Sequence, residues 1–137
     1  MAKTFLLEIF TPERLFFAGE IEALTVETTD GEMTILADHT PITAPLQIGK
    51  IKIKQTGEWK EAFQSEGFLE IDGKEVHLFV QACEWPEDID VARANAAEHR
   101  AKERLRQQKS MMEYRWTQSA LARAMARLRV TQDKFHL

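Results

Sequence analysis

The feature of this sequence that most restricts its fold is the point near residue 88 at which turn-forming residues and acidic charge both stop. The last glycine is Gly73 and the last proline is Pro86. Residues 1–88 carry a net charge of −10 and residues 89–137 carry +6, which together give the −4 of the chain. Because glycine and proline mark turns, these changes predict a turn-rich acidic part followed by a basic, uninterrupted helical part.

The first part shows the period-2 alternation of β-strands. Isoleucines alternate with lysines over residues 50–54. Another apolar row has the same spacing, at Val76, Leu78, Val80 and Ala82. Turn signals recur roughly every 8–12 residues, as in a sandwich or barrel, and no helical stretch separates the strands. We therefore expect an antiparallel β-sandwich over residues 1–86. Asp72-Gly73 is predicted to supply both central residues of a tight hairpin turn, where positive φ is favoured.

The second part, residues 87–137, is predicted to form an antiparallel hairpin of two helices. Alanine, arginine, leucine and other strong helix formers dominate it, and Asp88 is the expected N-cap of its first helix. Two apolar stripes recur at helical spacing: Ala94, Ala97, Ala101 and Leu105, and then Trp116, Ala120, Ala124 and Leu128. Stripes rich in alanine allow two helices to approach closely, which favours their packing against each other.

The join between the two helices is predicted from a capping motif. Ser110 and Glu113 have the spacing of a capping box, so the second helix should start near Met111, after a turn over residues 107–110. That turn contains no glycine or proline, so nothing in it forbids one continuous helix of up to 49 residues, about 70 Å long. A hairpin that can open and a permanently folded hairpin are both compatible with this sequence.

We find no arrangement of residues that predicts catalysis or a metal site in the first part. Cys83 is the only cysteine and has no base beside it, which favours a buried structural thiol over a nucleophile. Residues 67–74 fail the spacing of a phosphate-binding loop. His39 and His77 have no partner at ligand spacing, so a solvated or core role is favoured for each.

The arginines of the second part form two rows at helical spacing. One contains Arg93, Arg100 and Arg104, and the other contains Arg123 and Arg127. If the hairpin closes, the two rows can converge on an anion such as a polyphosphate, whose oxygens suit the planar guanidinium group. A solvated basic face is the simpler interpretation of the same rows, and spacing alone does not decide between the two.

Three segments, in this order, resemble the epsilon subunits of bacterial F-type ATP synthases. Residues 31–42 (GEMTILADHTPI) are similar to a characteristic loop of that family, and residues 67–71 (GFLEI) to its later strand signature. Residues 84–94 (EWPEDIDVARA) resemble the junction between its two domains and include Ile89-Asp90-x-x-Arg93-Ala94, which looks like the ATP-binding motif of bacterial members. The resemblance extends over nearly the whole chain.

This resemblance implies a rotor subunit with no catalytic residues of its own. In the family, a β-sandwich of about ten strands binds the gamma subunit and touches the ring of membrane c subunits, and Glu32 and His39 match the positions that face that ring. The two helices either fold down or extend along gamma into the catalytic head of alpha and beta subunits, where they hinder ATP hydrolysis. The implied location is the cytoplasmic face of the bacterial cell membrane, reached only through the complex.

The resemblance also implies a regulatory nucleotide and no required cofactor. Residues at the family's ATP-binding positions are Glu84, Ile89, Asp90, Arg93, Ala94, Arg100, Arg123 and Arg127. Asp90 is expected to hydrogen-bond the adenine edge while the arginines take the phosphates. Two other classes remain open from the residues alone. One is a nucleic-acid-binding module that uses the basic hairpin, although the acidic first part argues against nucleic acid as a partner. The other is a small enzyme acting on a nucleotide.

Overall fold

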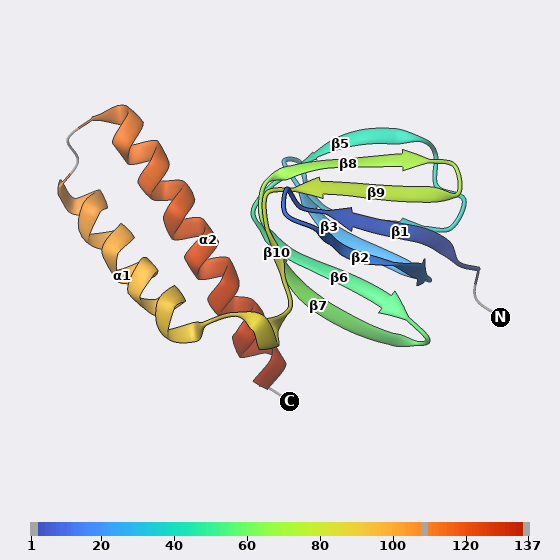
Figure 1. The fold of residues 1–137 in the computed structure, drawn as a ribbon. Helices are drawn as coiled ribbons and strands as arrows, with labels where there is room; N and C mark the ends of the chain where they lie inside the picture. The colour runs from blue at the N-terminus through green and yellow to red at the C-terminus, as the bar shows by residue number, and fades with distance from the viewer. Residues whose placement is uncertain (1–2, 108–109, 136–137) are drawn as a thin grey trace. The chain divides into compact units, whose positions relative to one another are not determined.

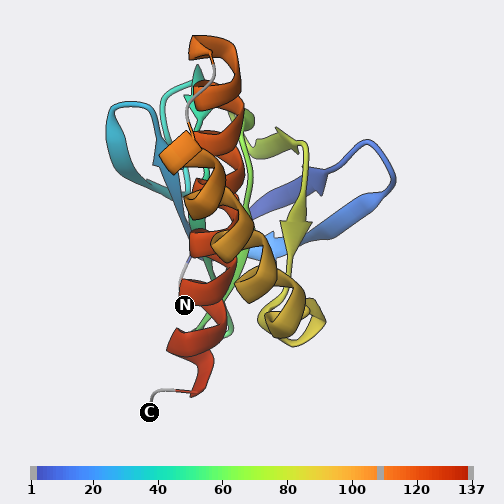
Figure 2. The same cartoon turned by 90° about the vertical axis from the view of Figure 1, so that its left-hand side faces the viewer.

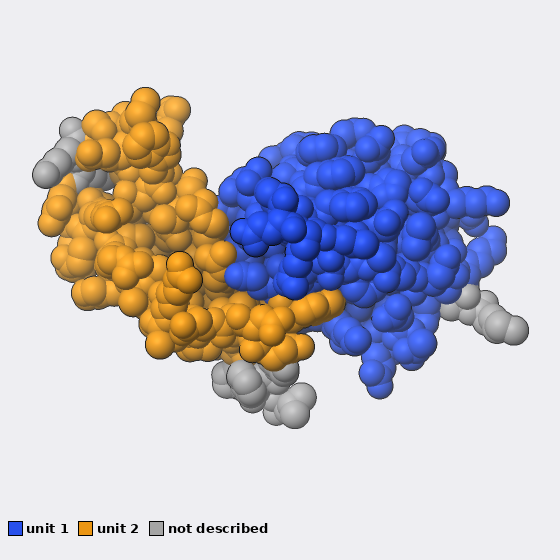
Figure 3. All heavy atoms as spheres, viewed as in Figure 1, with its two compact units in different colours: residues 1–84 blue, residues 85–137 orange. Residues whose placement is uncertain are grey.

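The computed structural model describes residues 3–107 and 110–135, and the side chains only as far as residue 132. The chain divides into two compact units, residues 1–84 and residues 85–137 (Figure 3). The sequence placed the division two residues later, between residues 86 and 87.

The first unit consists of ten strands joined into one hydrogen-bonded sheet (Figure 1). Their bounds are β1 (Phe5–Phe10), β2 (Leu15–Ile21), β3 (Ala23–Thr28), β4 (Gly31–Leu36), β5 (Ile42–Leu46), β6 (Gly49–Gln55), β7 (Glu58–Gln64), β8 (Gly67–Asp72), β9 (Glu75–Val80) and β10 (Cys83–Glu84). The order across the sheet is β10-β7-β6-β3-β5-β8-β9-β1-β2, with β4 paired to β3. The expected ten-stranded sandwich is confirmed.

The sheet curls so that β2, at one end of this order, returns to β6 near the other end. The Gln55 side-chain amide donates to the Glu20 carbonyl oxygen at 3.0 Å. Beside it, the Glu22 backbone N–H donates to the Lys54 carbonyl oxygen at 2.8 Å. Curling of this kind encloses one face of the sheet, and the alternating apolar side chains lie on that enclosed face.

The alternating apolar rows form the core of this unit. Ile51 and Ile53 are buried, while the lysines that alternate with them at positions 50, 52 and 54 are half-buried at the surface. Residues 76, 78 and 80 are buried as predicted. Ala82 was wrongly included in that row: it lies beyond the end of β9 and is half-exposed. The period-2 pattern therefore identified the buried face and overran the strand by two residues.

The prediction of an entirely antiparallel sheet was wrong at one pair of strands. β1 pairs with β9 in parallel, with Leu7 opposite Val76 and Glu8 opposite His77. A parallel pair needs a long connection between its strands, and the absence of a helix was taken to exclude one. Here the seven intervening strands make that connection, so β1 reaches β9 without any crossover helix.

The predicted hairpin turn between β8 and β9 was wrong by one residue. Asp72 is still part of β8 and pairs with Glu75, so the two-residue loop is Gly73-Lys74. Gly73 has a φ of +58°, whereas Lys74 is not among the residues with positive φ. A turn with positive φ at its first central position only is of the type II′ kind and needs glycine at that position alone.

The second unit begins with a short 3₁₀ turn, Pro86–Asp88, followed by α1 (Val91–Gln107) and α2 (Met111–Phe135). The two helices run side by side in opposite directions (Figures 1 and 2). The predicted start of α2 at Met111 is confirmed: the Ser110 hydroxyl oxygen accepts the Glu113 backbone N–H at 3.1 Å. Positions 108 and 109 of the predicted turn lie outside the described residues.

The N-cap of α1 is Asp90, and the prediction of Asp88 was wrong. Asp90 Oδ1 accepts the Arg93 backbone N–H at 3.0 Å, and the Asp90 carbonyl oxygen accepts the Ala94 N–H at 2.9 Å. Asp88 is instead the last residue of the 3₁₀ turn that Pro86 opens. This extra turn displaces the helix start by two residues, and the sequence offered a capping carboxylate at both places.

Most of the predicted stripe residues are buried or half-buried, but Trp116 is not. Ala94, Ala101, Ala124 and Leu128 are buried. The other members, Ala97, Leu105 and Ala120, are half-buried. Trp116 is 66% exposed and was wrongly placed in the packed stripe. It lies near the turn end of the hairpin, where its indole borders a groove between the helices instead of filling the contact.

Candidate functional site

The start of α1 collects four of the predicted nucleotide-binding residues into one turn. Ile89 is buried and its N–H donates to the Pro86 carbonyl oxygen at 3.2 Å, which fixes the backbone just before the helix. Asp90 is exposed, although one of its carboxylate oxygens caps the helix. The second oxygen retains lone pairs that can accept from a ligand N–H, because an ionised carboxylate has about four acceptor positions.

The four predicted arginines lie on both helices of the hairpin. Arg93 and Arg100 are exposed on α1, and Arg123 and Arg127 are half-exposed on α2. Ala101 and Ala120 line the same groove between the helices, so the antiparallel helices face each other at about this level.

Because the helices are antiparallel, residues that precede Ala101 in α1 lie opposite residues that follow Ala120 in α2. Both arginine rows therefore lie along the same stretch of the hairpin. Seven residues separate Arg93 from Arg100, so that stretch is about 10 Å long at about 1.5 Å per residue. The paired helices therefore place these arginines along a stretch about as long as a polyphosphate, and binding of an anion there stays a prediction.

A groove of about 480 Å³ lies between the helices near the turn. Its lining residues are Ala97, Arg100, Ala101, Arg104, Gln107, Glu113, Tyr114, Trp116, Thr117 and Ala120. Of the predicted nucleotide-binding residues, only Arg100 is among them. Sequence reasoning missed Tyr114 and Trp116 as groove residues because the helical period assigned Trp116 to the packed stripe.

Glu84, the remaining predicted nucleotide residue, belongs to the first unit. It is half-buried in β10, where its register partner is Phe63 of β7. The other seven belong to the second unit.

The two residues predicted to face the c-ring lie in and after the side strand β4. Glu32 is exposed, and its register partner in β3 is Glu27. His39 follows β4 and is half-exposed, and its Nδ1 lies 2.8 Å from the Thr40 carbonyl oxygen. A carbonyl oxygen only accepts, so this hydrogen bond requires a proton on Nδ1.

Cys83 is buried, as expected for a structural thiol. It is 4% exposed, and burial, with a smaller contribution from the Glu84 carboxylate, raises the pKa of its thiol from 9.0 to about 12. A thiol held protonated in this way is a poor nucleophile at neutral pH.

We therefore expect a thiol reagent at pH 8 to label Cys83 at least about tenfold more slowly in the native chain than in the urea-unfolded chain. An unfolded thiol ionises near pH 9.0, whereas the folded one stays protonated up to about 12, so stability falls as pH rises through this interval. Stopped-flow labelling measures the first effect, and alkaline denaturation checks the second. Equal labelling rates in the two states would contradict the burial.

Sequence reasoning also missed the surroundings of His77. Glu8 lies opposite it across the parallel pair, and Glu75 precedes it by two residues on the same strand. Only the Glu75-x-His77 spacing was visible in the sequence, because Glu8 is 69 residues away from His77.

The fold defines a class of two-domain proteins in which a ten-stranded β-sandwich precedes an antiparallel helical hairpin. Residues 4–86 match the family model described as ATP synthase, Delta/Epsilon chain, beta-sandwich domain, and residues 87–132 match that of its long alpha-helix domain. The chain therefore belongs to the ATP synthase delta/epsilon family.

Within that family, the chain is similar to proteins named ATP synthase epsilon chain. It is 50% identical to that of Caldanaerobacter subterraneus subsp. tengcongensis over 131 residues, which cover 95% of each chain. It is 45% identical to that of Ruminiclostridium cellulolyticum over 131 residues, covering 96% of this chain and 98% of the relative. A chain in the Euglena gracilis mitochondrial ATP synthase structure has the same fold, with a TM-score of 0.80 at 19% identity, covering 97% of this chain and 82% of that one.

Proposed function

We propose that this chain is the epsilon subunit of a bacterial F-type ATP synthase: a non-catalytic rotor component that couples proton flow to ATP synthesis and restrains ATP hydrolysis. The observation that carries the proposal is the match to both domain models of the family, in order, over residues 4–132. Relatives named epsilon chain support it over almost the full length of the chain.

In this proposal the β-sandwich anchors the chain to the gamma subunit and the c-ring. Glu32 and His39 are on accessible surface, as contacts with the ring require. No helix in the described part of the chain is long and apolar enough to cross a membrane. Association with the cytoplasmic face of the cell membrane would then occur through the complex.

The helical hairpin acts as the brake on hydrolysis. Its net charge of +6 over residues 89–137 suits contact with an acidic segment of the beta subunit in the catalytic head. The buried alanines become exposed when α1 and α2 separate, so the extended state needs a partner surface to replace their packing. Gamma and the catalytic head would supply that surface.

ATP is proposed to favour the folded hairpin. A ligand that binds the folded arrangement alone stabilises it by about 1.4 kcal/mol at ten times its dissociation constant, a roughly tenfold shift in population. The two arginine rows lie along the same stretch only while the helices are paired. ATP would therefore bind the folded hairpin more tightly than the extended helices.

Hydrolysis by the catalytic head of alpha, beta and gamma subunits tests the brake. The head is reconstituted with the full chain or with a chain that ends at Pro86. We expect both forms to bind gamma and only the full chain to lower the rate, because residues 87–137 carry the helices. Equal rates with both forms bound would refute an inhibitory hairpin. Failure of both forms to bind the head would refute the rotor assignment.

A further inference from the structure

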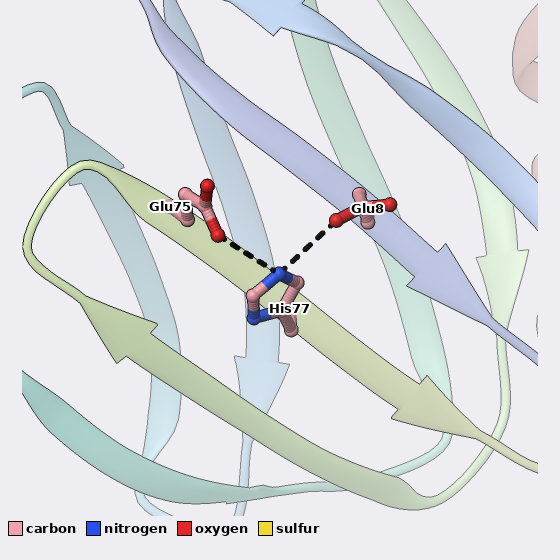
Figure 4. A group of neighbouring side chains, drawn as sticks. All are labelled: Glu8, Glu75 and His77. Carbon is pink, nitrogen blue, oxygen red and sulfur yellow. Dashed lines mark hydrogen bonds and ion pairs between the residues drawn. The ribbon is translucent and has the colours of Figure 1, made fainter.

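Three side chains from two strands meet on the outer face of the β-sandwich (Figure 4). Glu8 of β1 lies directly opposite His77 of β9 in the parallel register, and Glu75 occupies the same face of β9. On the other side of His77, its register partner in β8 is Glu70, which adds another carboxylate to this face. The face thus surrounds one imidazole with acidic groups.

The distances within this cluster fit a small tetrahedral ion. His77 Nε2 lies 3.1 Å from Glu8 Oε1 and 3.5 Å from Glu75 Oε2. All three ligand atoms lie within 4.8 Å of one another. A tetrahedral zinc ion with bonds of about 2.0–2.1 Å holds its ligand atoms about 3.3 Å apart, between the two observed separations. Small rotations of the Glu8 and Glu75 side chains would complete the geometry.

We propose that Glu8, Glu75 and His77 form a binding site for a divalent ion of the zinc class. Two carboxylate oxygens and one imidazole nitrogen are a mixed set that suits zinc, cobalt or nickel, whereas magnesium and calcium prefer oxygen alone. His77 and Glu8 are half-exposed and Glu75 is exposed, so water has access to the fourth position. This site is independent of the proposed role of the hairpin.

The strands place the ligands before any ion arrives. Sites built on sheet positions are held more accurately than sites on loops, and the rings of Phe10 and Phe79 lie beside the imidazole at 6.3 and 6.5 Å between centroids. Without an ion, an Nε2–H of His77 donates to Glu8. The ion would take the Nε2 lone pair of the neutral imidazole, whose proton would then sit on Nδ1.

An ion at this position would bridge β1 to β9. These strands form the parallel pair that joins the β1–β2 hairpin to β9. A ligand that binds only the folded state raises the stability of that state as the ligand concentration increases. The bound ion would therefore hold the β1–β2 hairpin against β9.

Calorimetric titration of the full chain with Zn²⁺, and with Mg²⁺ for comparison, tests the site. We expect one Zn²⁺ per chain, no comparable binding of Mg²⁺, and a melting temperature that rises with Zn²⁺ concentration. Co²⁺ bound there should show the visible absorption of a tetrahedral ion. His77→Gln and Glu8→Gln should each weaken Zn²⁺ binding by at least about tenfold, since the loss of even an outer partner of a ligand costs this much.

His39→Gln is the matched control, because that imidazole is also half-exposed on the same unit but bonds a backbone carbonyl. It should leave Zn²⁺ affinity unchanged. The melting temperature of each variant without metal shows whether the variant is folded. Binding that survives in both folded cluster variants, or that falls equally in His39→Gln, would overturn the proposal, as would the absence of Zn²⁺ binding to the original chain.

Discussion

Gly67→Ala is expected to destabilise the β-sandwich by at least about 3 kcal/mol, because a methyl group has no room there. Gly67 opens β8, and an added Cβ would overlap the carbonyl oxygen of Phe79 and lie 2.8 Å from Val80 Cα, both in β9. These neighbours are backbone atoms of a central strand, which cannot rotate away as a side chain can. Relief would require β8 and β9 to separate where Gly67 pairs with Val80.

Gly57→Ala provides the matched control for the same chemical change. Gly57 has a φ of +79° and no heavy atom within 4 Å of an added Cβ, so only the left-handed backbone opposes alanine there. We expect that cost to be about 1–2 kcal/mol. Urea unfolding followed by circular dichroism gives both values. A Gly67→Ala chain as stable as Gly57→Ala would show that β8 and β9 are not this close in solution.

The close approach at Gly67 also explains why the GFLEI segment was informative in the sequence. A glycine at the start of a strand of alternating apolar residues indicates a position in the sheet where two backbones approach closely. Local interactions likewise explain the period-2 rows, the Ser110 cap and the change in composition near residue 88. Each depends on neighbours a few residues away, and each was predictable for that reason.

The errors arose where distant residues or competing local signals decide the structure. The parallel pairing of β1 with β9 depends on the path of seven intervening strands, which no local pattern records. Asp88 and Asp90 are equally good caps, and the 3₁₀ turn opened by Pro86 selects the second. Trp116 has the right spacing for the packed stripe, yet it lies at the end of the hairpin where a groove replaces close packing.

The two candidate sites also differ in whether local sequence could predict them. The arginine rows could be predicted because helical spacing determines which residues share a side of one helix, and the hairpin then brings the two helices together. The metal-ligating cluster could not be predicted, because Glu8 joins Glu75 and His77 only through the parallel register. Long-range pairing is therefore the part of the site that the sequence did not reveal.

Arg93→Ala and Arg123→Ala are each expected to weaken ATP binding to the isolated chain by roughly 10–100-fold. A hydrogen bond between charged groups contributes about 1.5–3 kcal/mol, and a guanidinium group can form two to one phosphate. The two residues come from different helices, so a loss in both variants would show that ATP binds the paired hairpin. Alanine is a strong helix former, so neither change should unfold its helix.

Arg106→Ala is the control for a loss of positive charge on the hairpin. Arg106 is exposed in the last turn of α1 and pairs with Glu103 at 3.0 Å, outside the stretch that holds the two rows. Its removal should change ATP affinity by less than about threefold, since exposed charges are screened by salt. Calorimetry measures affinity, and circular dichroism confirms the helices. If all three variants bind ATP equally, the arginine rows are a solvated basic face. If only Arg93→Ala and Arg123→Ala lose affinity, ATP binds the paired hairpin through arginines of both helices.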